Sequence, residues 1–371
     1  MSEQVLTDNL KRTPFHKYHI EAGAKMVLFA GYIMPVQYNG ITEEHLAVRK
    51  NVGLFDLSHM GEFEVMGPRA LSFIQKMTTN DASKLAVGQI QYSIMCYDDG
   101  GIVDDLLVYR LKDRYMLVVN ASNIQKDFDW LETHLEAGVE LTNISNQIGL
   151  LAIQGPNAQK VVAEITEYDL NSLPYYHCAN MDFGDYSLLA SCTGYTGEDG
   201  FEIYIPTQLC EYVWNRVMNA GKKYDIKLIG LGARDSLRLE MKMALYGNDI
   251  DKTTTPIEAG LAWVVNFDKG NFTGRDVLIK QRDEKPNRRL ICLELEGKAF
   301  PRHGYKLISN GRTVGHVTSG TFSPSLGKPI AMGYVPLELT KIGSIVDVKI
   351  RDKLFSATVI KPPFYKKGTH R

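Results

Sequence analysis

The sequence predicts an α+β protein that ends in a small all-β domain, and three observations lead to this class. Helical and strand-like patterns mix over the first 285 residues, without the regular alternation of a doubly wound sheet. Residues 280–289 (KQRDEKPNRR) are charged, contain Pro286 and lack any apolar side chain, which is typical of a domain boundary. Beyond them helical periodicity disappears. We therefore expect two regions, residues 1–285 and residues 286–371.

The first region combines a hairpin pattern with several helical patterns. Thr13 and Pro14 are the expected N-cap and first residue of a helix. Two apolar runs, 90–96 and 102–111, flank an Asp-Asp-Gly-Gly segment and predict a β-hairpin. Two further helices are predicted where apolar residues recur at helical spacing before a glycine, at 122–135 and 208–220.

The second region shows only short strand-like runs that are separated by Gly and Pro. The runs lie at 290–295, 313–318, 330–335, 345–350 and 355–360. A segment of about 80 residues with this pattern predicts a small β-barrel or sandwich.

Charge and composition exclude several classes of function. The 42 Lys and Arg residues are balanced by 43 Asp and Glu residues, so a nucleic acid is not the expected main partner. No apolar run is long enough to span a membrane, and the first residues lack the apolar core of a signal peptide. We therefore expect a cytoplasmic protein without a membrane segment.

The cysteines, histidines and glycines give no sign of a metal or nucleotide site. The five cysteines are scattered and never form a C-x-x-C motif, and His16 and His19 are expected to be polar side chains in a first helix. Gly230 and Gly232 lack the third glycine of a dinucleotide fingerprint, and neither a P-loop nor a G-x-S-x-G elbow occurs. We expect no bound metal.

Two clusters contain carboxylates in positions that suggest a site. In GGIVDD, Asp104 and Asp105 are neighbours within an apolar strand, so one of them should point inward, where an unpaired carboxylate is costly. An ion pair on an edge strand is the alternative interpretation. The segment TGYTGEDGFE, residues 193–202, places three acids in a glycine-rich loop that leads into a strand. A solvated acidic turn is the alternative there.

A third cluster, GLGARDSLRLE at residues 230–240, places Arg234 near the start of a predicted helix. An arginine in this position suits an anionic ligand better than it suits the helix dipole.

These clusters occur in a characteristic order together with two others. DLSHMGE (56–62), GGIVDD (100–105), TGYTGEDGFE (193–202), GLGARDSLRLE (230–240) and GHVTSGTFSPSLG (315–327) follow one another along the chain. In this order the sequence strongly resembles the aminomethyltransferases, the T-proteins of the glycine cleavage system. The likeness runs from Lys11 to about Tyr365.

The resemblance implies a fold and a reaction. The fold is three domains around a central hole that holds tetrahydrofolate: two interleaved α+β domains and a C-terminal β-barrel. The reaction transfers the one-carbon unit from the aminomethylated lipoyl arm of the H-protein to tetrahydrofolate. It gives 5,10-methylenetetrahydrofolate, ammonia and dihydrolipoyl H-protein, and it connects the protein indirectly to the P- and L-proteins of the same system.

The resemblance also implies roles for three charged residues. Glu202 would accept the two N–H donors of the pterin ring, which one carboxylate can bind together. Arg234 would bind folate, and we expect it to meet the glutamate carboxylates of the folate tail. Asp105 would be the catalytic aspartate, which positions and polarises N5 and assists proton transfer.

Further residues match the family's folate pocket less directly. These are Tyr92, Asn120 and Tyr195, together with Arg371 near the C-terminus. Cys192 departs from the family pattern, because relatives often have an arginine just before the TGYTGEDG loop.

Two related functions are weaker alternatives. A folate-binding accessory protein of iron–sulfur cluster assembly shares the fold, but its K-G-C-[YF]-x-G-Q-E signature is replaced here by KGNFTGRD at residues 269–276. The folate half of a sarcosine or dimethylglycine oxidase would need an additional flavin domain, for which 371 residues leave no room.

Overall fold

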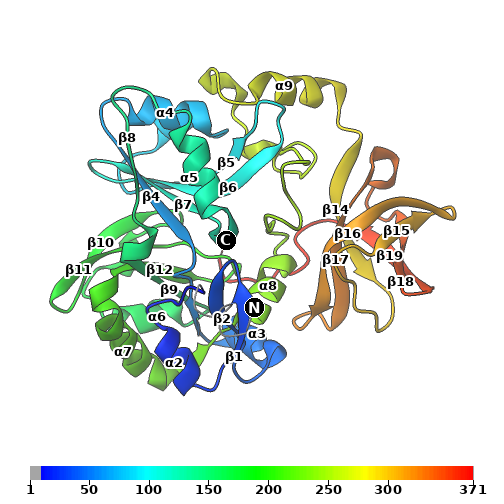
Figure 1. Ribbon diagram of the computed structural model, residues 1–371. Coiled ribbons are helices and arrows are strands. Elements are labelled where there is room, and N and C mark those ends of the chain that lie inside the picture. The colour runs from blue at the N-terminus through cyan, green and yellow to red at the C-terminus, as the bar shows by residue number, and fades with distance from the viewer. Residues whose placement is uncertain (1–9, 371) are drawn as a thin grey trace, which may run out of the picture.

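The computed structural model describes residues 10–370, which form two α+β units and a barrel (Figure 1). The first unit is an antiparallel five-stranded sheet. Its strands, in spatial order, are β5 (Ile90–Cys96), β6 (Ile102–Arg110), β7 (Tyr115–Val119), β4 (Gly61–Met66) and β8 (Glu140–Asn143). The helices α4 (Ala70–Met77) and α5 (Ile124–Glu132) supply apolar side chains to the same core, among them Phe73 and Ile74 from α4.

The second unit is a six-stranded sheet built from segments on both sides of the first unit. Its strands, in spatial order, are β10 (Cys178–Phe183), β11 (Tyr186–Ser191), β12 (Gly200–Pro206), β9 (Ile148–Gln154), β3 (Gly53–Asp56) and β13 (Lys227–Leu228). The chain leaves this sheet after β3, builds the five-stranded sheet, and returns with β9. The two α+β units are therefore interleaved along the chain.

Helices cover the outer face of the six-stranded sheet, and a common apolar layer joins its other face to the first unit. The covering helices are α2 (His16–Glu21), α6 (Ala158–Ala163) and α7 (Cys210–Gly221). The shared layer combines Val118 of the five-stranded sheet with Leu150 and Tyr204 of the six-stranded sheet. Burial of this shared layer holds the two sheets together, because removing apolar surface from water is the main favourable term in folding.

The helices α3 (Ile41–Lys50) and α8 (Leu231–Glu240) pack against each other beside the hairpin of β1 (Lys25–Phe29) and β2 (Tyr32–Gln37). Helix α8 also contacts the barrel strand β16. It therefore lies between the second unit and the barrel (Figure 1).

The C-terminal domain is a closed six-stranded barrel. Its strands, in spatial order, are β14 (Arg288–Leu295), β17 (Lys328–Pro336), β16 (Arg312–Ser323), β15 (Lys306–Ser309), β18 (Ile345–Ile350) and β19 (Lys353–Ile360). Because β14 pairs with both β17 and β19, the sheet closes, which decides for a barrel and against a sandwich. The five predicted runs are all strands, whereas the four-residue strand β15 was not predicted.

Several predicted boundaries differ from the observed ones. The helix α9 (Arg275–Glu284) occupies half of the charged segment, so only residues 285–287 connect it to β14. A surface helix tolerates this composition because Leu278 is its only buried residue. The helix α5 is confirmed with shorter ends, and α7 is confirmed with its start two residues later and its end one residue later than predicted. The first helix begins at His16 and not at the predicted Pro14. The residues before it form a turn in which the Thr13 carbonyl accepts a hydrogen bond from the His16 N–H.

After β19 the chain returns from the barrel to the second unit. The Tyr365 N–H donates to the Glu240 carbonyl (2.9 Å), and the Thr369 N–H donates to Oε2 of Glu198 (2.9 Å). The C-terminal end therefore lies near the centre of the molecule (Figure 1). Within residues 10–370, no helix combines the length and the apolar character that crossing a bilayer requires.

Candidate active site

A cavity of about 870 Å³ lies between the two α+β units. Its walls come from β5, β6 and β7 on one side and from β9, β12 and the start of α8 on the other. Phe29 at the tip of the β1–β2 hairpin and the exposed Trp263 also line it. Among the described residues the barrel supplies no lining side chain, and it contacts α8 from behind.

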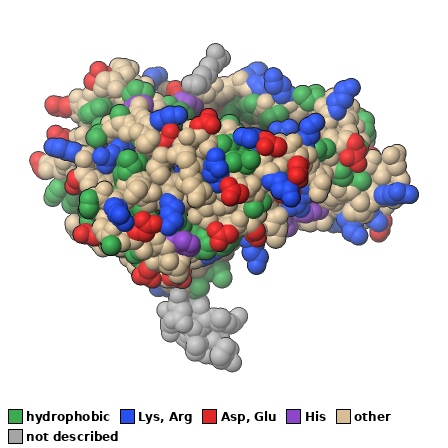
Figure 2. All heavy atoms as spheres, turned by 90° about the horizontal axis from the view of Figure 1, so that it is seen from above, with side chains coloured by type: hydrophobic (Ala, Val, Ile, Leu, Met, Phe, Trp, Pro, Cys, Tyr) green, Lys and Arg blue, Asp and Glu red, His purple; other side chains and the backbone are tan. Residues whose placement is uncertain are grey.

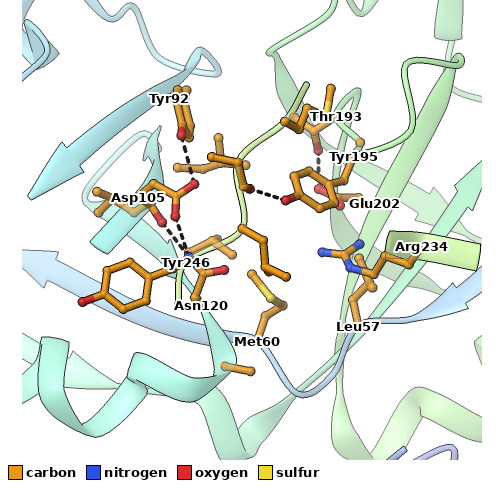
Figure 3. Close-up of a pocket in the computed structure, with 18 of the residues that line it drawn as sticks. Leu57, Met60, Tyr92, Asp105, Asn120, Thr193, Tyr195, Glu202, Arg234 and Tyr246 are labelled. Carbon is orange, nitrogen blue, oxygen red and sulfur yellow. Dashed lines mark hydrogen bonds between the residues drawn. The ribbon is translucent and has the colours of Figure 1, made fainter. Parts of the chain in front are cut away.

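At one end of the cavity, Asp105 is held by two polar neighbours (Figure 3). Its Oδ2 accepts from the Tyr92 hydroxyl (2.9 Å), and its Oδ1 accepts from Nδ2 of Asn120 (2.8 Å). Burial and the nearby charge of Asp104 raise the pKa of Asp105 to about 7, although both hydrogen bonds oppose the rise. A carboxyl group with this pKa changes its protonation state in the physiological range, which suits it to general acid–base chemistry.

Asp104 points away from the cavity and is fully buried, which confirms that one of the two neighbours faces inward. Its Oδ1 accepts from Nδ2 of Asn120 (2.9 Å) and from Nδ2 of Asn123 (2.6 Å), and its Oδ2 accepts from the Asn120 N–H (3.0 Å). Asn120 therefore links both carboxylates, and Asp104 serves to position it.

At the other end of the cavity, Glu202 projects from β12 (Figure 3). Its Oε2 accepts from the hydroxyl of Thr193 (2.5 Å). Burial raises the pKa of Glu202, whereas the Thr193 hydrogen bond and the charge of Arg234 act in the opposite direction.

Arg234 lies in the first turn of α8 at the same end of the cavity (Figure 3). Its guanidinium carbon is 4.8 Å from the ring centre of Tyr195, and burial lowers its pKa. The Tyr195 hydroxyl donates to the Ala244 carbonyl. No side chain within residues 10–370 forms a hydrogen bond or ion pair with Arg234. A half-buried guanidinium without a protein acceptor is suited to binding a ligand oxygen.

The glycine-rich loop before β12 is shaped by Gln154 of β9. The Gln154 amide donates to the Thr193 carbonyl (3.0 Å) and accepts from the Thr196 hydroxyl (3.0 Å). A Cβ on Gly194 would lie 2.0 Å from Oε1 of Gln154, so a larger residue here would displace the Gln154 amide from these hydrogen bonds. The loop is therefore a packed structure and not a solvated turn.

Arg49 of α3 joins this loop to α8. Its guanidinium donates to Glu198 (2.8 Å), to the Thr196 carbonyl (2.6 Å) and to Oε2 of Glu240 (2.9 Å), and it lies 4.3 Å from the Tyr365 ring centre. The side chains of Arg49, Glu198 and Glu240 are almost completely buried. One arginine thus connects the segments that carry Glu202 and Arg234 with the C-terminal segment.

The structure brings together six of the seven predicted site residues. Asp105, Tyr92 and Asn120 are at one end, and Glu202, Arg234 and Tyr195 are at the other. Arg371 lies outside the described residues. Cys192 is partly buried beside the loop, and its N–H donates to the His177 carbonyl (2.9 Å).

Sequence reasoning missed His59, Thr193 and Trp263 as lining residues. His59 and Thr193 belong to motifs that were recognised as whole segments, without a role for each residue. Burial and the charge of Arg234 lower the pKa of His59 to about 4, so its ring is neutral at pH 7. Trp263 stacks on Tyr92 with the ring centres 5.8 Å apart, and no local pattern marks it. No group of three or more potential metal-ligating side chains occurs in the described part of the chain.

A cavity of this size, with ionisable groups at two separated ends and apolar walls between them, is typical of an enzyme that acts on an elongated small molecule. The comparisons with known proteins identify the family. Residues 15–269 match the GCVT N-terminal domain, and residues 288–366 match the glycine cleavage T-protein C-terminal barrel domain. The chain belongs to the glycine cleavage T-protein family, the aminomethyltransferases.

Individual relatives agree with this assignment. The aminomethyltransferase of Flavobacterium psychrophilum is 50% identical over 361 residues, which cover 96% of this chain and 100% of the relative. That of Bacillus subtilis is 46% identical, with the same coverage. The crystal structure of aminomethyltransferase T from Bartonella henselae matches with a TM-score of 0.91 and 37% identity, over 98% of this chain and 100% of that one. These matches favour aminomethyl transfer over the iron–sulfur accessory function.

Proposed function

We propose that the protein transfers a one-carbon unit from the aminomethylated lipoyl arm of an H-protein to tetrahydrofolate, with release of ammonia. The observation that carries this proposal is the placement of Asp105, with a pKa of about 7, at the opposite end of one cavity from Glu202 and Arg234. When bound, tetrahydrofolate supplies the nucleophilic nitrogen that accepts the carbon.

Glu202 and Arg234 are chemically matched to a pterin ring. The ring presents N–H donors beside a carbonyl acceptor, so a carboxylate and a guanidinium side by side can satisfy one ring edge. Arg234 is close enough to Glu202 to lower the pKa of the carboxyl group. Because Arg234 is this close to Glu202, we propose that it contacts the edge of the pterin ring. The sequence instead predicts a contact with the carboxylates of the folate tail.

Asp105 would act on the nitrogen that receives the carbon. Its carboxylate, oriented by Tyr92 and Asn120, can accept a proton or stabilise positive charge that develops there. The pair formed by Tyr92 and the exposed Trp263 lies beside it and offers an aromatic surface to the arriving donor.

The direct test is an assay with aminomethylated H-protein and tetrahydrofolate. We expect ammonia and methylenetetrahydrofolate to form in equal amounts and only when both reactants are present. Folate binding without any turnover of the H-protein would contradict the proposal and favour an accessory function.

Replacing Glu202 by Gln, or Arg234 by Ala, should weaken tetrahydrofolate binding more than it lowers the maximal rate. Each change removes a charged hydrogen-bond partner of the ligand, which is worth roughly 1.5–3 kcal/mol. Calorimetry should therefore show about a ten- to hundredfold loss of affinity. If both variants bind tetrahydrofolate like the unchanged protein, the assigned ring site is wrong.

The residues after Tyr365 should contribute both to the folate site and to docking of the H-protein. Lys366 and Lys367 are exposed on a segment that folds back over the TGYTGEDG loop. Figure 2 shows basic and acidic side chains interspersed over the face seen from above. A chain that ends at Tyr365 loses the Thr369 contact with Glu198. We expect lower activity with free aminomethyl-lipoate, and a larger loss with the H-protein as donor.

The matched control for this truncation is the double variant Lys366→Gln and Lys367→Gln, which keeps the backbone contacts. It should lose activity only with the H-protein. Unchanged rates with both donors in the truncated chain would show that the segment contributes neither to docking nor to the folate site.

A further inference from the structure

Behind Glu202, a continuous row of hydroxyl groups runs through the layer between the two sheets. Glu202 accepts from Thr193 (2.5 Å), and Thr193 contacts Ser191 (2.6 Å). Ser191 contacts the Tyr109 hydroxyl (3.3 Å), which contacts the Tyr204 hydroxyl (2.7 Å). The row joins β11, β12 and the loop between them to β6 of the other unit.

A count of protons fixes the direction of every bond in this row. Each hydroxyl has one proton to donate. Because Thr193 donates its proton to the Glu202 carboxylate, Ser191 must donate to Thr193. Tyr109 must then donate to Ser191, and Tyr204 to Tyr109. All four donors therefore point toward one negative charge, and bonds aligned in this way polarise one another.

Most of the row lies outside the cavity. Ser191 and Tyr109 are fully buried and Tyr204 is 4% exposed, and none of the three lines the cavity. Only Thr193 and Glu202 reach its wall. A substitution at Ser191 or Tyr109 therefore alters the row without removing a group that a ligand touches.

The other ionisable groups that face Glu202 come from α8, β4, β6, β12 and the segment before β10. Arg234 of α8 favours its charged form. Glu62 of β4 is buried, and burial together with the charge of Glu202 raises the pKa of Glu62 well above its ordinary value. The remaining groups are tyrosines whose pKa values are raised by burial first and by the charge of Glu202 in addition, namely Tyr109, Tyr175, Tyr176 and Tyr204. Arg234 is thus the one cation near Glu202 within residues 10–370.

We propose that Ser191, Tyr109 and Tyr204 are positioning residues, which act through Thr193 to hold the Glu202 carboxylate ionised and in one orientation for its ligand. This inference rests on the proposed function of Glu202 as the acceptor of the pterin donors. Without the row of hydroxyl groups, burial would oppose ionisation of Glu202, and only the charge of Arg234 would offset this effect. A protonated Glu202 presents a donor to the ligand's own N–H donors, and this weakens binding.

The experiment measures tetrahydrofolate affinity by calorimetry between pH 5 and pH 9. The full-length chain is compared with Ser191→Ala and Tyr109→Phe. Because the ionised form of Glu202 binds the ligand, affinity falls as pH drops through the pKa of this group. Loss of the row should raise that pKa, so the midpoint of the fall should move upward by about one pH unit in Ser191→Ala and by less in Tyr109→Phe. Affinity at pH 9 should be nearly unchanged.

Tyr334→Phe is the matched control for Tyr109→Phe. Tyr334 is also buried, and its hydroxyl donates to the Asp249 carbonyl (2.9 Å) on the barrel side of the molecule. It should leave the pH profile unchanged. A midpoint that stays in place in both Ser191→Ala and Tyr109→Phe overturns the inference, as does an equal loss of affinity at every pH. Tyr109→Phe keeps the ring, so it tests the row even if Ser191→Ala folds poorly.

Glu202→Gln separates this inference from the proposed function. If Glu202→Gln leaves affinity unchanged, the assigned ring site is wrong and the row has no ligand to serve. If Glu202→Gln weakens binding while the other variants keep the original midpoint, the ring site stands and the inference about the row falls.

Discussion

Replacing Asp105 by Asn should lower turnover by roughly 10²–10⁴-fold, while the protein stays folded and still binds tetrahydrofolate. The asparagine keeps the size of the side chain and an oxygen that can accept from Tyr92 or Asn120, but it can neither take up a proton nor carry a negative charge. The loss should therefore appear in kcat, measured with aminomethylated H-protein at saturating folate. A large rise in KM with little change in kcat would contradict the assigned role.

The pH dependence gives a second measurement on the same residue. Burial and the charge of Asp104 raise the pKa of Asp105 to about 7, so the ionised form that we propose to be active is lost as pH falls below that value. The rate of the unchanged enzyme should rise with pH through about 7. This part of the profile should be absent in Asp105→Asn.

Asp104→Asn is the comparison for Asp105→Asn. Asp104 accepts three hydrogen bonds from Asn120 and Asn123. In Asp104→Asn the new NH₂ group would face these N–H donors, so at least one hydrogen bond would be lost. We expect a lower thermal midpoint for this variant and a smaller effect on kcat of the folded protein. If Asp104→Asn abolishes turnover and Asp105→Asn is silent, the catalytic assignment belongs to the other aspartate.

Replacing Arg49 by Met should have the largest effect on stability. It leaves the carboxylates of Glu198 and Glu240 buried with their main cation removed. Breaking a buried ion pair on one side typically costs about 3–5 kcal/mol. The thermal midpoint should fall by several degrees, as followed by calorimetry or circular dichroism. Arg282→Met on the exposed face of α9 is the control, and it should leave the midpoint almost unchanged.

The pH dependence of stability distinguishes the loss of the Arg49 charge from a simple loss of packing. Burial opposes ionisation of Glu240, but His45, Arg49 and Ser323 outweigh it and lower its pKa to about 2. Burial lowers the pKa of His45, and Arg49 supplies a permanent positive charge beside Glu240. The stability that Glu240 contributes is complete above about pH 4.5 and is lost as pH falls toward 2. Arg49→Met should flatten this dependence. An unchanged dependence would show that Arg49 acts only through packing.

Local patterns in the sequence predicted several helices and strands in each of the two regions. The hairpin of β5 and β6, the helices α5 and α7, and five of the six barrel strands follow from periodicity and turn residues. The strand β15 was missed because its four residues include only the apolar pair Leu307 and Ile308. The charged composition of residues 280–289 predicts a linker, whereas residues 280–284 form the second half of α9, whose surface is mostly charged.

By itself, the sequence determined the mixed and all-β regions and the family resemblance, and it predicted the candidate residues of the site. Only the tertiary structure decided how these residues meet. Asp104 and Asp105 are adjacent in the chain, yet one is enclosed and the other opens to the cavity, because their strand alternates between two faces. Tyr109 and Tyr204 lie 95 residues apart and touch because the two sheets bury a common apolar layer. Arg49 meets Glu198 and Glu240 across 149 and 191 residues. Contacts of this kind depend on which faces pack together, and no local periodicity encodes that choice.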